Sequence, residues 1–197
     1  MPTTWWMTAG LTLAAYLIGA LPFGVWVGYV VLRRDVRAGG SGHSGATNTM
    51  RQAGWAVGAL VLALDLAKGY AALWLAQRWL APEVLWLIGA ATVAGHCWPV
   101  WAQFRGGMGI ATAGGAVLAV SPLGFVLGLG LLAAGSLALK HSARGNMAAG
   151  VLIGPVLWLF TGQWPITLLG AAVGLVIAMR SFSNWRRMYR ELWLDRK

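Results

Sequence analysis

A polar, glycine-rich stretch between two long apolar runs, residues 40–51, holds the side chains best suited to ligand binding. Its glycines and alanine let the backbone approach a ligand closely, and Ser41, Thr47 and Asn48 supply hydrogen-bond donors. Arg51 ends the stretch with a positively charged guanidinium group, which can donate two parallel hydrogen bonds. This combination suits an oxyanion, most simply a phosphate, so we predict a phosphate-binding loop.

A second glycine-rich element, residues 95–112, contains His96 and Arg105. An apolar run begins near Gly109, and the free N–H groups at a helix start form an anion site. Glycine also serves close packing in membrane helices, but two such elements with an arginine each favour a joint site. His96 could act as a general base, as a phosphate ligand or as a structural residue.

Two charged residues, Asp65 and Lys68, interrupt an otherwise apolar run. At this spacing they share one face of a helix, and ionised groups in hydrocarbon are costly enough that both should face the protein interior. Two readings stay open. The pair could be a structural ion pair, or Lys68 could contact a substrate phosphate while Asp65 holds a loop.

The composition identifies an integral membrane protein. The chain of 197 residues is 58% hydrophobic and 10% charged, with a mean hydropathy of +0.66. Soluble domains carry about 25% charged residues. The net charge of +10 fits anionic lipid and phosphorylated substrates better than nucleic acid. The single Cys97 excludes an internal disulfide and a cysteine-based metal cluster, and we expect neither a metal nor a cofactor.

The apolar runs predict an all-α, polytopic fold in a single domain, residues 1–197, with about seven transmembrane helices, some of them short. Ser121-Pro122 should break a helical hairpin whose first arm does not fully span the membrane. A tight turn at Gly162-Gln163 should join the last two helices. The runs are 4–32, 53–76, 84–102, 109–120, 121–139, 147–162 and 164–180.

All lysines and arginines except Lys68 and Arg78 fall in four stretches, 33–51, 103–108, 140–146 and 180–197. The positive-inside rule then predicts an external N-terminus and a cytoplasmic C-terminus. In the loop expected at 140–146, Ser142, Arg144 and Asn146 could reach the site, and Asn184 could close it from the C-terminal side. The tail from Trp185 to Lys197 is expected on the membrane surface, or merely solvated. Arg187→Ala should therefore not abolish activity, whereas Arg51→Ala should.

These motifs resemble the bacterial acyl-phosphate-dependent (PlsY-type) glycerol-3-phosphate acyltransferases along nearly the whole chain. The family's first motif, Gly-Ser-Gly-Asn-x-Gly-Ala-Thr-Asn-x-x-Arg, matches at Gly40, Ser41, Gly42, Gly45, Ala46, Thr47, Asn48 and Arg51. Asp65, Lys68 and Gly69 match its Asp-x-x-Lys-Gly. Its second motif matches at Gly95, His96, Pro99, Phe104, Gly106, Gly107, Gly109, Ala111 and Thr112, and Asn184 matches the asparagine of a third.

Five positions depart from the family pattern. His43 replaces an asparagine, Arg105 a lysine, and Met108 a phosphate-binding lysine. Ala20 replaces a serine usual in the first helix. Ala143 stands where a serine is expected, and Arg144 could supply the charge missing at 108. A changed acyl acceptor, or a non-catalytic lipid-binding, phosphate-binding or transport protein, are the alternatives that these departures leave open.

The resemblance implies acyl transfer from acyl phosphate to the 1-hydroxyl of glycerol 3-phosphate, which gives lysophosphatidic acid for phospholipid synthesis. Membrane lipid would be a further partner, and the site would face the cytoplasm at the bacterial inner membrane. His96, Ser41 and Asn184 are expected to be catalytic. The expected phosphate-binding residues are Ser41, Gly42, Thr47, Asn48, Arg51, Lys68, Arg105, Gly106, Gly107 and Thr112, with Ser142, Arg144 and Asn146 as further contacts.

Overall fold

The protein is a helical bundle in a computed structural model that describes residues 5–187. Six helical segments of the described chain are long and apolar enough to cross a membrane, and α6 is a shorter apolar helix. The helices are α1 (Trp5–Gly19), α2 (Phe23–Leu32), α3 (Ala46–Ala53), α4 (Trp55–Ala76), α5 (Leu85–Cys97), α6 (Ile110–Val120), α7 (Pro122–Leu139), α8 (Ser142–Thr161) and α9 (Trp164–Phe182), with short 3-10 turns at Val36–Ala38, Pro82–Val84 and Val100–Ala102.

The short arm predicted at 109–120 is confirmed. Helix α6 has 11 residues, and the Ser121 side chain caps α7 by accepting a hydrogen bond from the Gly124 N–H at 3.0 Å. The turn at Gly162 is confirmed too, because this glycine adopts the left-handed conformation (φ 62°) after α8.

Three expected boundaries were wrong. The run 4–32 is two helices, because Pro22 has no N–H with which to continue α1. The stretch 40–51 is not all loop, since α3 begins at Ala46. The loop expected at 140–146 is largely helix, because the His141 ring accepts from the Arg144 N–H and starts α8 at Ser142.

Helices pack closely where a glycine faces the backbone of a neighbouring helix. A Cβ on Gly69 of α4 would overlap the Thr112 carbonyl of α6, and one on Gly174 of α9 would overlap the Gly150 carbonyl of α8. The main core lies among α1, α4, α5, α6 and α9 around fully buried residues such as Leu73 and Ile88. Helix α7 buries only Gly124, so most of its surface faces outward.

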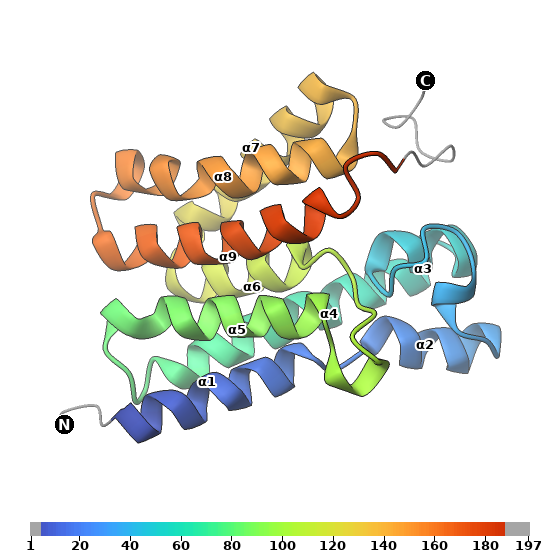
Figure 1. Ribbon diagram of the computed structural model, residues 1–197, viewed down its shortest axis with the longest axis horizontal. Coiled ribbons are helices and arrows are strands. Elements are labelled where there is room, and N and C mark those ends of the chain that lie inside the picture. The colour runs from blue at the N-terminus through green and yellow to red at the C-terminus, as the bar shows by residue number, and fades with distance from the viewer. Residues whose placement is uncertain (1–4, 188–197) are drawn as a thin grey trace.

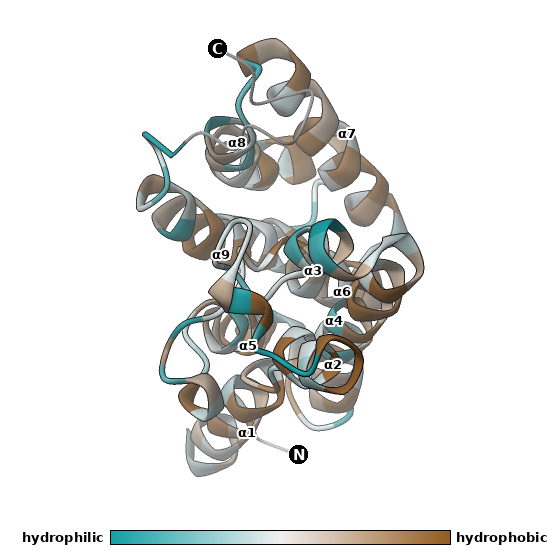
Figure 2. Ribbon diagram, turned by 90° about the vertical axis from the view of Figure 1, so that its right-hand side faces the viewer, coloured by the Kyte–Doolittle hydropathy of each residue, from teal (hydrophilic) through white to brown (hydrophobic). Residues whose placement is uncertain are grey.

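The connections that carry the predicted site lie together. In Figure 1 the start of α1 lies opposite α2, α3 and the end of α9. Viewed from the α2–α3 end, hydrophilic segments appear on α3, beside α5 and on α8 and α9 (Figure 2). The fold thus brings polar segments distant in sequence to one end of an otherwise apolar bundle.

Candidate active site

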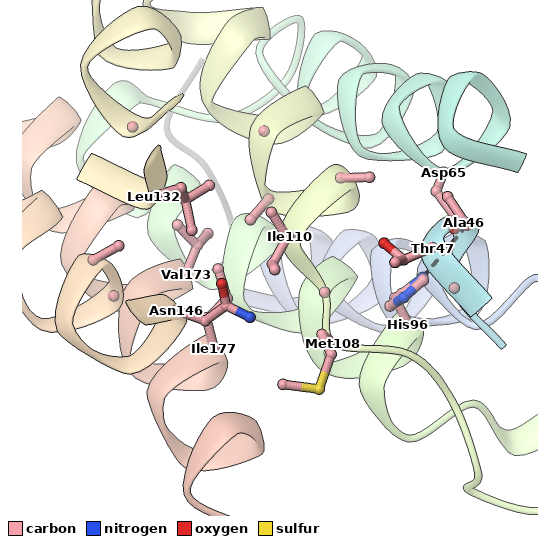
Figure 3. Close-up of a pocket in the computed structure, with 18 of the residues that line it drawn as sticks. Ala46, Thr47, Asp65, His96, Met108, Ile110, Leu132, Asn146, Val173 and Ile177 are labelled. Carbon is pink, nitrogen blue, oxygen red and sulfur yellow. Dashed lines mark ion pairs between the residues drawn. The ribbon is translucent and has the colours of Figure 1, made fainter. Parts of the chain in front are cut away.

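A cavity of about 630 Å³ runs into the bundle from this polar end. Its polar lining includes Ser41, His43, Arg51 and Asn184, and we call this part of the cavity its mouth. Figure 3 shows Thr47, Asp65 and His96 close together on one side of the cavity. Its inner part is apolar and lies among α6, α7, α8 and α9. The residues there include Ala113, Gly114, Val117, Phe125, Gly128, Leu129, Leu132, Ala149, Ile153, Val173 and Ile177.

Three helix N-termini converge on the mouth. The first residues of α3 (Ala46, Thr47), of α6 (Ile110, Ala111) and of α8 (Ser142, Ala143) all line the cavity. The positive end of a helix dipole and the unpaired N–H groups of its first turn attract anions. The mouth can therefore hold negatively charged groups, while the inner part can hold only apolar ones.

Asn48 organises the first polar loop from within. Its buried amide oxygen accepts from the Ser41 N–H at 2.7 Å, and its amide nitrogen donates to the carbonyls of Val36 (2.9 Å), Gly39 (3.2 Å) and His43 (2.8 Å). These bonds use most of the hydrogen-bonding capacity of the amide. Asn48 thus fixes the backbone that presents Ser41 and His43.

Arg37 joins the two polar loops, a role that the sequence did not reveal. Its guanidinium pairs with Asp35 at 2.7 Å and donates to the carbonyls of Ala102 (2.7 Å) and Arg105 (3.0 Å). The hydrogen bond from Arg37 holds the pKa of the Asp35 carboxyl below its ordinary value.

The second glycine-rich loop is held by its own backbone. The N–H groups of Gly106 and Gly107 donate to the carbonyls of Cys97 and His96, both at 3.2 Å. The carbonyls of the same two glycines accept from Arg180 at 3.1 and 3.0 Å. These glycines therefore shape the loop rather than offer N–H groups to a ligand, and the anion-binding capacity lies at the start of α6.

His96 is buried between a carboxylate and a glycine. Its Nδ1 lies 3.4 Å from Asp65 Oδ1 (dashed in Figure 3), and a Cβ on Gly107 would overlap the Nε2 side of the ring. Lys68 Nζ lies 2.8 Å from the same Asp65 oxygen and donates to the Leu21 carbonyl at 3.0 Å. The carboxylate thus orients the imidazole, and Lys68 balances the charge of the carboxylate.

His43 lies among positive charges. Burial, followed by the charges of Arg180, Arg187, Arg51 and His96, lowers the pKa of His43 to about 4. At neutral pH the imidazole is uncharged, and an anion bound nearby would oppose the effect of the arginines.

The predicted site residues fall into two groups. Ser41, Thr47, Asn48, Arg51, His96, Ser142, Asn146 and Asn184 line the cavity. Gly42, Lys68, Arg105, Gly106, Gly107, Thr112 and Arg144 do not line it.

Each charged or hydroxyl-bearing member of the second group has another environment. Lys68 pairs with Asp65, and Arg105 is exposed. Thr112 is fully buried at the contact of α6 with Gly69. Arg144 is exposed, with its guanidinium 5.1 Å from the Trp185 ring centroid. Its replacement of the lysine charge missing at Met108 stays a prediction. The Met108 sulfur lies 3.7 Å from the amide nitrogen of Asn184.

A metal centre has no candidate ligand set within residues 5–187, where no three His, Cys, Asp or Glu side chains cluster in a way that could hold an ion. The described part of the site offers charge through helix N-termini and guanidinium groups instead.

Known proteins resemble this chain over most of its length. The family profile described as glycerol-3-phosphate acyltransferase matches residues 9–191. The glycerol-3-phosphate acyltransferase of Listeria monocytogenes serotype 4a (strain HCC23) is 35% identical over 181 residues, 90% of this chain and 91% of that protein. That of Myxococcus xanthus (strain DK1622) is 43% identical over 146 residues, 73% of this chain and 76% of that protein.

A crystal structure of PlsY, an integral membrane glycerol 3-phosphate acyltransferase in its glycerol 3-phosphate form, superposes with a TM-score of 0.80 at 31% identity and covers 91% of this chain and 90% of that one. The lysophosphatidic acid form of the same enzyme gives a TM-score of 0.78 at 29% identity over the same shares. The profile match over residues 9–191, the relatives and the solved structures show that this chain is a multi-pass membrane acyltransferase that belongs to the glycerol-3-phosphate acyltransferase family.

Proposed function

We propose that this protein transfers a fatty acyl group from acyl phosphate to the 1-hydroxyl of glycerol 3-phosphate and so forms lysophosphatidic acid for phospholipid synthesis. The observation that carries the proposal is the single cavity with an anion-attracting mouth and an apolar interior. Both substrates carry a phosphate, and one carries a long alkyl chain. A cavity of this kind accommodates both at once.

The cavity is long enough for the reacting groups and part of an acyl chain. Along α8 its lining runs from Ser142 at the polar mouth to Ile153 in the apolar part, which corresponds to about 16 Å for the whole cavity at the rise of an α-helix. The chain would enter between α6, α7, α8 and α9, and the outward-facing α7 would separate it from lipid. The carbonyl and phosphate would remain at the mouth.

At the mouth, the starts of α3, α6 and α8 and the guanidinium of Arg51 would hold the two phosphates. Ser41, Thr47, Ser142 and Asn146 add donors around them, and Asn184 lies across from these. Lys68 is held by Asp65 and the Leu21 carbonyl, and Thr112 is fully buried, so we propose that these two stabilise the surrounding structure rather than bind substrate directly. Arg105 is exposed outside the cavity lining, and its contact with a phosphate stays a prediction.

The reaction needs alignment rather than a protein nucleophile. The 1-hydroxyl oxygen of glycerol 3-phosphate attacks the acyl carbonyl carbon, the bond from that carbon to the phosphate oxygen breaks, and inorganic phosphate leaves. The hydroxyl proton passes to His96, held by Asp65, or to the departing phosphate. The donors at the mouth stabilise the negative charge that develops on the carbonyl oxygen.

We also propose that the mouth faces the cytoplasm at the inner membrane of a bacterium. The support is the positive-inside rule, since the described arginines outside the membrane spans, except Arg78, lie in the connections at the site end. Acyl phosphate and glycerol 3-phosphate would then both reach the site from the cytoplasmic side.

The test is an acyl-transfer assay on the purified protein with acyl phosphate and a panel of phosphorylated and unphosphorylated acceptors, with products identified by mass spectrometry. We expect lysophosphatidic acid from glycerol 3-phosphate. Arg51→Ala should lower kcat/KM by about ten- to a hundredfold, the loss of one charge-assisted contact. Arg78→Ala is the matched control, because Arg78 stacks on Trp74 at 3.7 Å, outside the cavity lining.

Folded protein that transfers no acyl group to any acceptor would overturn the proposal. Transfer to another acceptor in preference to glycerol 3-phosphate would identify a changed specificity, which the neutral Met108 in the cavity lining favours. In that case Met108→Lys should increase activity with glycerol 3-phosphate.

A further inference from the structure

After α9 the described chain continues in turns beside the cavity, whose lining includes Asn184. Backbone hydrogen bonds from Asn184 to Ser181 (2.9 Å), from Trp185 to Phe182 (3.1 Å) and from Arg187 to Asn184 (3.0 Å) form a tight succession of turns. We name residues 184–187 the C-terminal turn. Its backbone is fixed by short-range bonds of the kind that end a helix.

Side chains tie the C-terminal turn to the rest of the site. Asn184 is buried, lines the cavity and donates to the Arg180 carbonyl at 3.2 Å. The Trp185 ring lies 5.1 Å from the guanidinium carbon of Arg144 on α8, within the range of a cation–π contact. The turn is thus held at both the α9 side and the α8 side of the mouth.

The turn places Arg187 against the first polar loop. One guanidinium nitrogen lies 3.5 Å from the position that a Cβ would take on Gly42. Gly42 has a φ of 69° and stands between Ser41 and His43, both of which line the cavity. Arg187 itself is exposed and is not among the residues that line the cavity, so its positive charge lies just outside the lining, beside the loop that presents Ser41 and His43.

The electrostatics of His43 support this placement. Arg187 contributes to lowering the pKa of this cavity-lining imidazole, together with Arg180 and Arg51. Asp65, the carboxylate in the cavity lining, already has Lys68 at 2.8 Å. Guanidinium groups gathered around one opening repel one another, and a bound phosphate relieves that repulsion.

We propose that Arg187 is a substrate-binding residue that contacts a substrate phosphate at the mouth of the cavity, where Met108 offers no charge. The inference deepens the proposed function and rests on it for the identity of the phosphate, which belongs either to glycerol 3-phosphate or to the acyl donor. It also replaces the expectation that Arg187 belongs to a tail that lies on the membrane surface or is merely solvated.

Binding and turnover are measured separately, so that the two proposals can fail independently. Arg187→Ala and Arg187→Lys are compared with Arg186→Ala, which removes the neighbouring exposed arginine. Calorimetry in detergent gives dissociation constants for glycerol 3-phosphate and for dodecyl phosphate, which has the phosphate and a chain but no reactive carbonyl. Thermal unfolding of each variant verifies the fold.

We expect Arg187→Ala to lower the affinity for one of the two ligands by about ten- to a hundredfold. The affected ligand identifies which substrate phosphate Arg187 contacts. Arg187→Lys should retain most of the affinity because it keeps the charge, and Met108→Lys should recover part of the loss in the Arg187→Ala background. In active enzyme the loss should appear mainly in KM of the same substrate.

Equal affinities of Arg187→Ala and Arg186→Ala for both ligands, within about twofold, would overturn the inference whether or not the protein turns over. Binding that depends on Arg187 in a protein without acyl transfer would support the inference and refute the proposed function.

Discussion

Substitution of Lys68 tests directly whether the buried charges stabilise the fold or bind the substrate. Its ammonium lies 2.8 Å from Asp65 and 3.0 Å from the Leu21 carbonyl, and its side chain is 3% exposed. Lys68→Met keeps the length of the side chain and removes the charge. Asp65 would then be left with His96 at 3.4 Å.

The expected cost follows from this burial. Removing one partner of a buried ion pair costs about 3–5 kcal/mol, because the remaining charge stays desolvated. On the scale of a chain of this size, such a loss lowers the melting temperature by about 6–20 °C. Removing both charges should cost much less, since a buried pair replaced by neutral groups is often close to neutral. Asp65→Asn combined with Lys68→Met should therefore recover most of the loss.

The assay is thermal unfolding in detergent together with steady-state kinetics at a temperature where every variant is folded. Lys140→Met is the control, because Lys140 is an exposed lysine at the end of α7. We expect the single variant Lys68→Met to melt early while KM for glycerol 3-phosphate stays close to that of the unaltered protein. An unchanged melting temperature with a large rise in that KM would refute the structural role and indicate that Lys68 binds the substrate.

Three further predictions concern the loop, the imidazole and the acyl cavity. Asn48→Ala removes the hydrogen bonds of the Ser41 N–H and the His43 carbonyl, and each unsatisfied buried group costs about 1–3 kcal/mol of stability. The loop should then lose its conformation, and kcat/KM should fall at least tenfold. Activity near that of the unaltered protein would contradict the role of Asn48 in fixing the loop. The pKa of His43 is lowered from 6.5 to about 4, so between these pH values the unfolded chain binds a proton that the folded chain does not, and stability is lost as the pH falls. Between pH 7 and pH 5 the melting temperature of His43→Asn should therefore fall by less than that of the unaltered protein. An equal fall in the two proteins would contradict the assignment. Gly128 lines the cavity, and a Cβ on it would lie 3.6 Å from Ile153, so Gly128→Leu should fill the middle of the cavity. The kcat/KM for long-chain acyl phosphates should then fall relative to that for shorter ones. An unchanged dependence of kcat/KM on chain length would place the acyl chain elsewhere.

The Arg187 inference has a consequence for the C-terminal turn as a whole. If a bound phosphate holds Arg187, it also holds Trp185, which stands two residues earlier and stacks on Arg144. The Trp185 indole is partly exposed, so its environment can report on binding. The same contact joins α8 and α9 at the mouth, where both helices line the cavity.

Much of the fold could be predicted from composition and spacing. Apolar runs near 20 residues long predict membrane helices because hydrocarbon leaves the backbone no partner but itself, and α4, α7 and α9 lie close to the predicted runs. Boundaries failed where a local capping group decided them. The His141 ring starts α8 at Ser142, and a polar sequence there looked like a loop.

The sequence by itself determined the membrane class, the family and the stretches that surround the site, because residue types and their order carry that information. The sequence predicts Ser41, Arg51, His96 and Asn184 at one site, and all four line the cavity. Which side chains face the cavity was decided only by the tertiary structure. An arginine or a lysine has the same charge wherever it lies, and its role depends on the groups that packing brings to it. Packing places Lys68 against Asp65 and turns Arg187 back over Gly42.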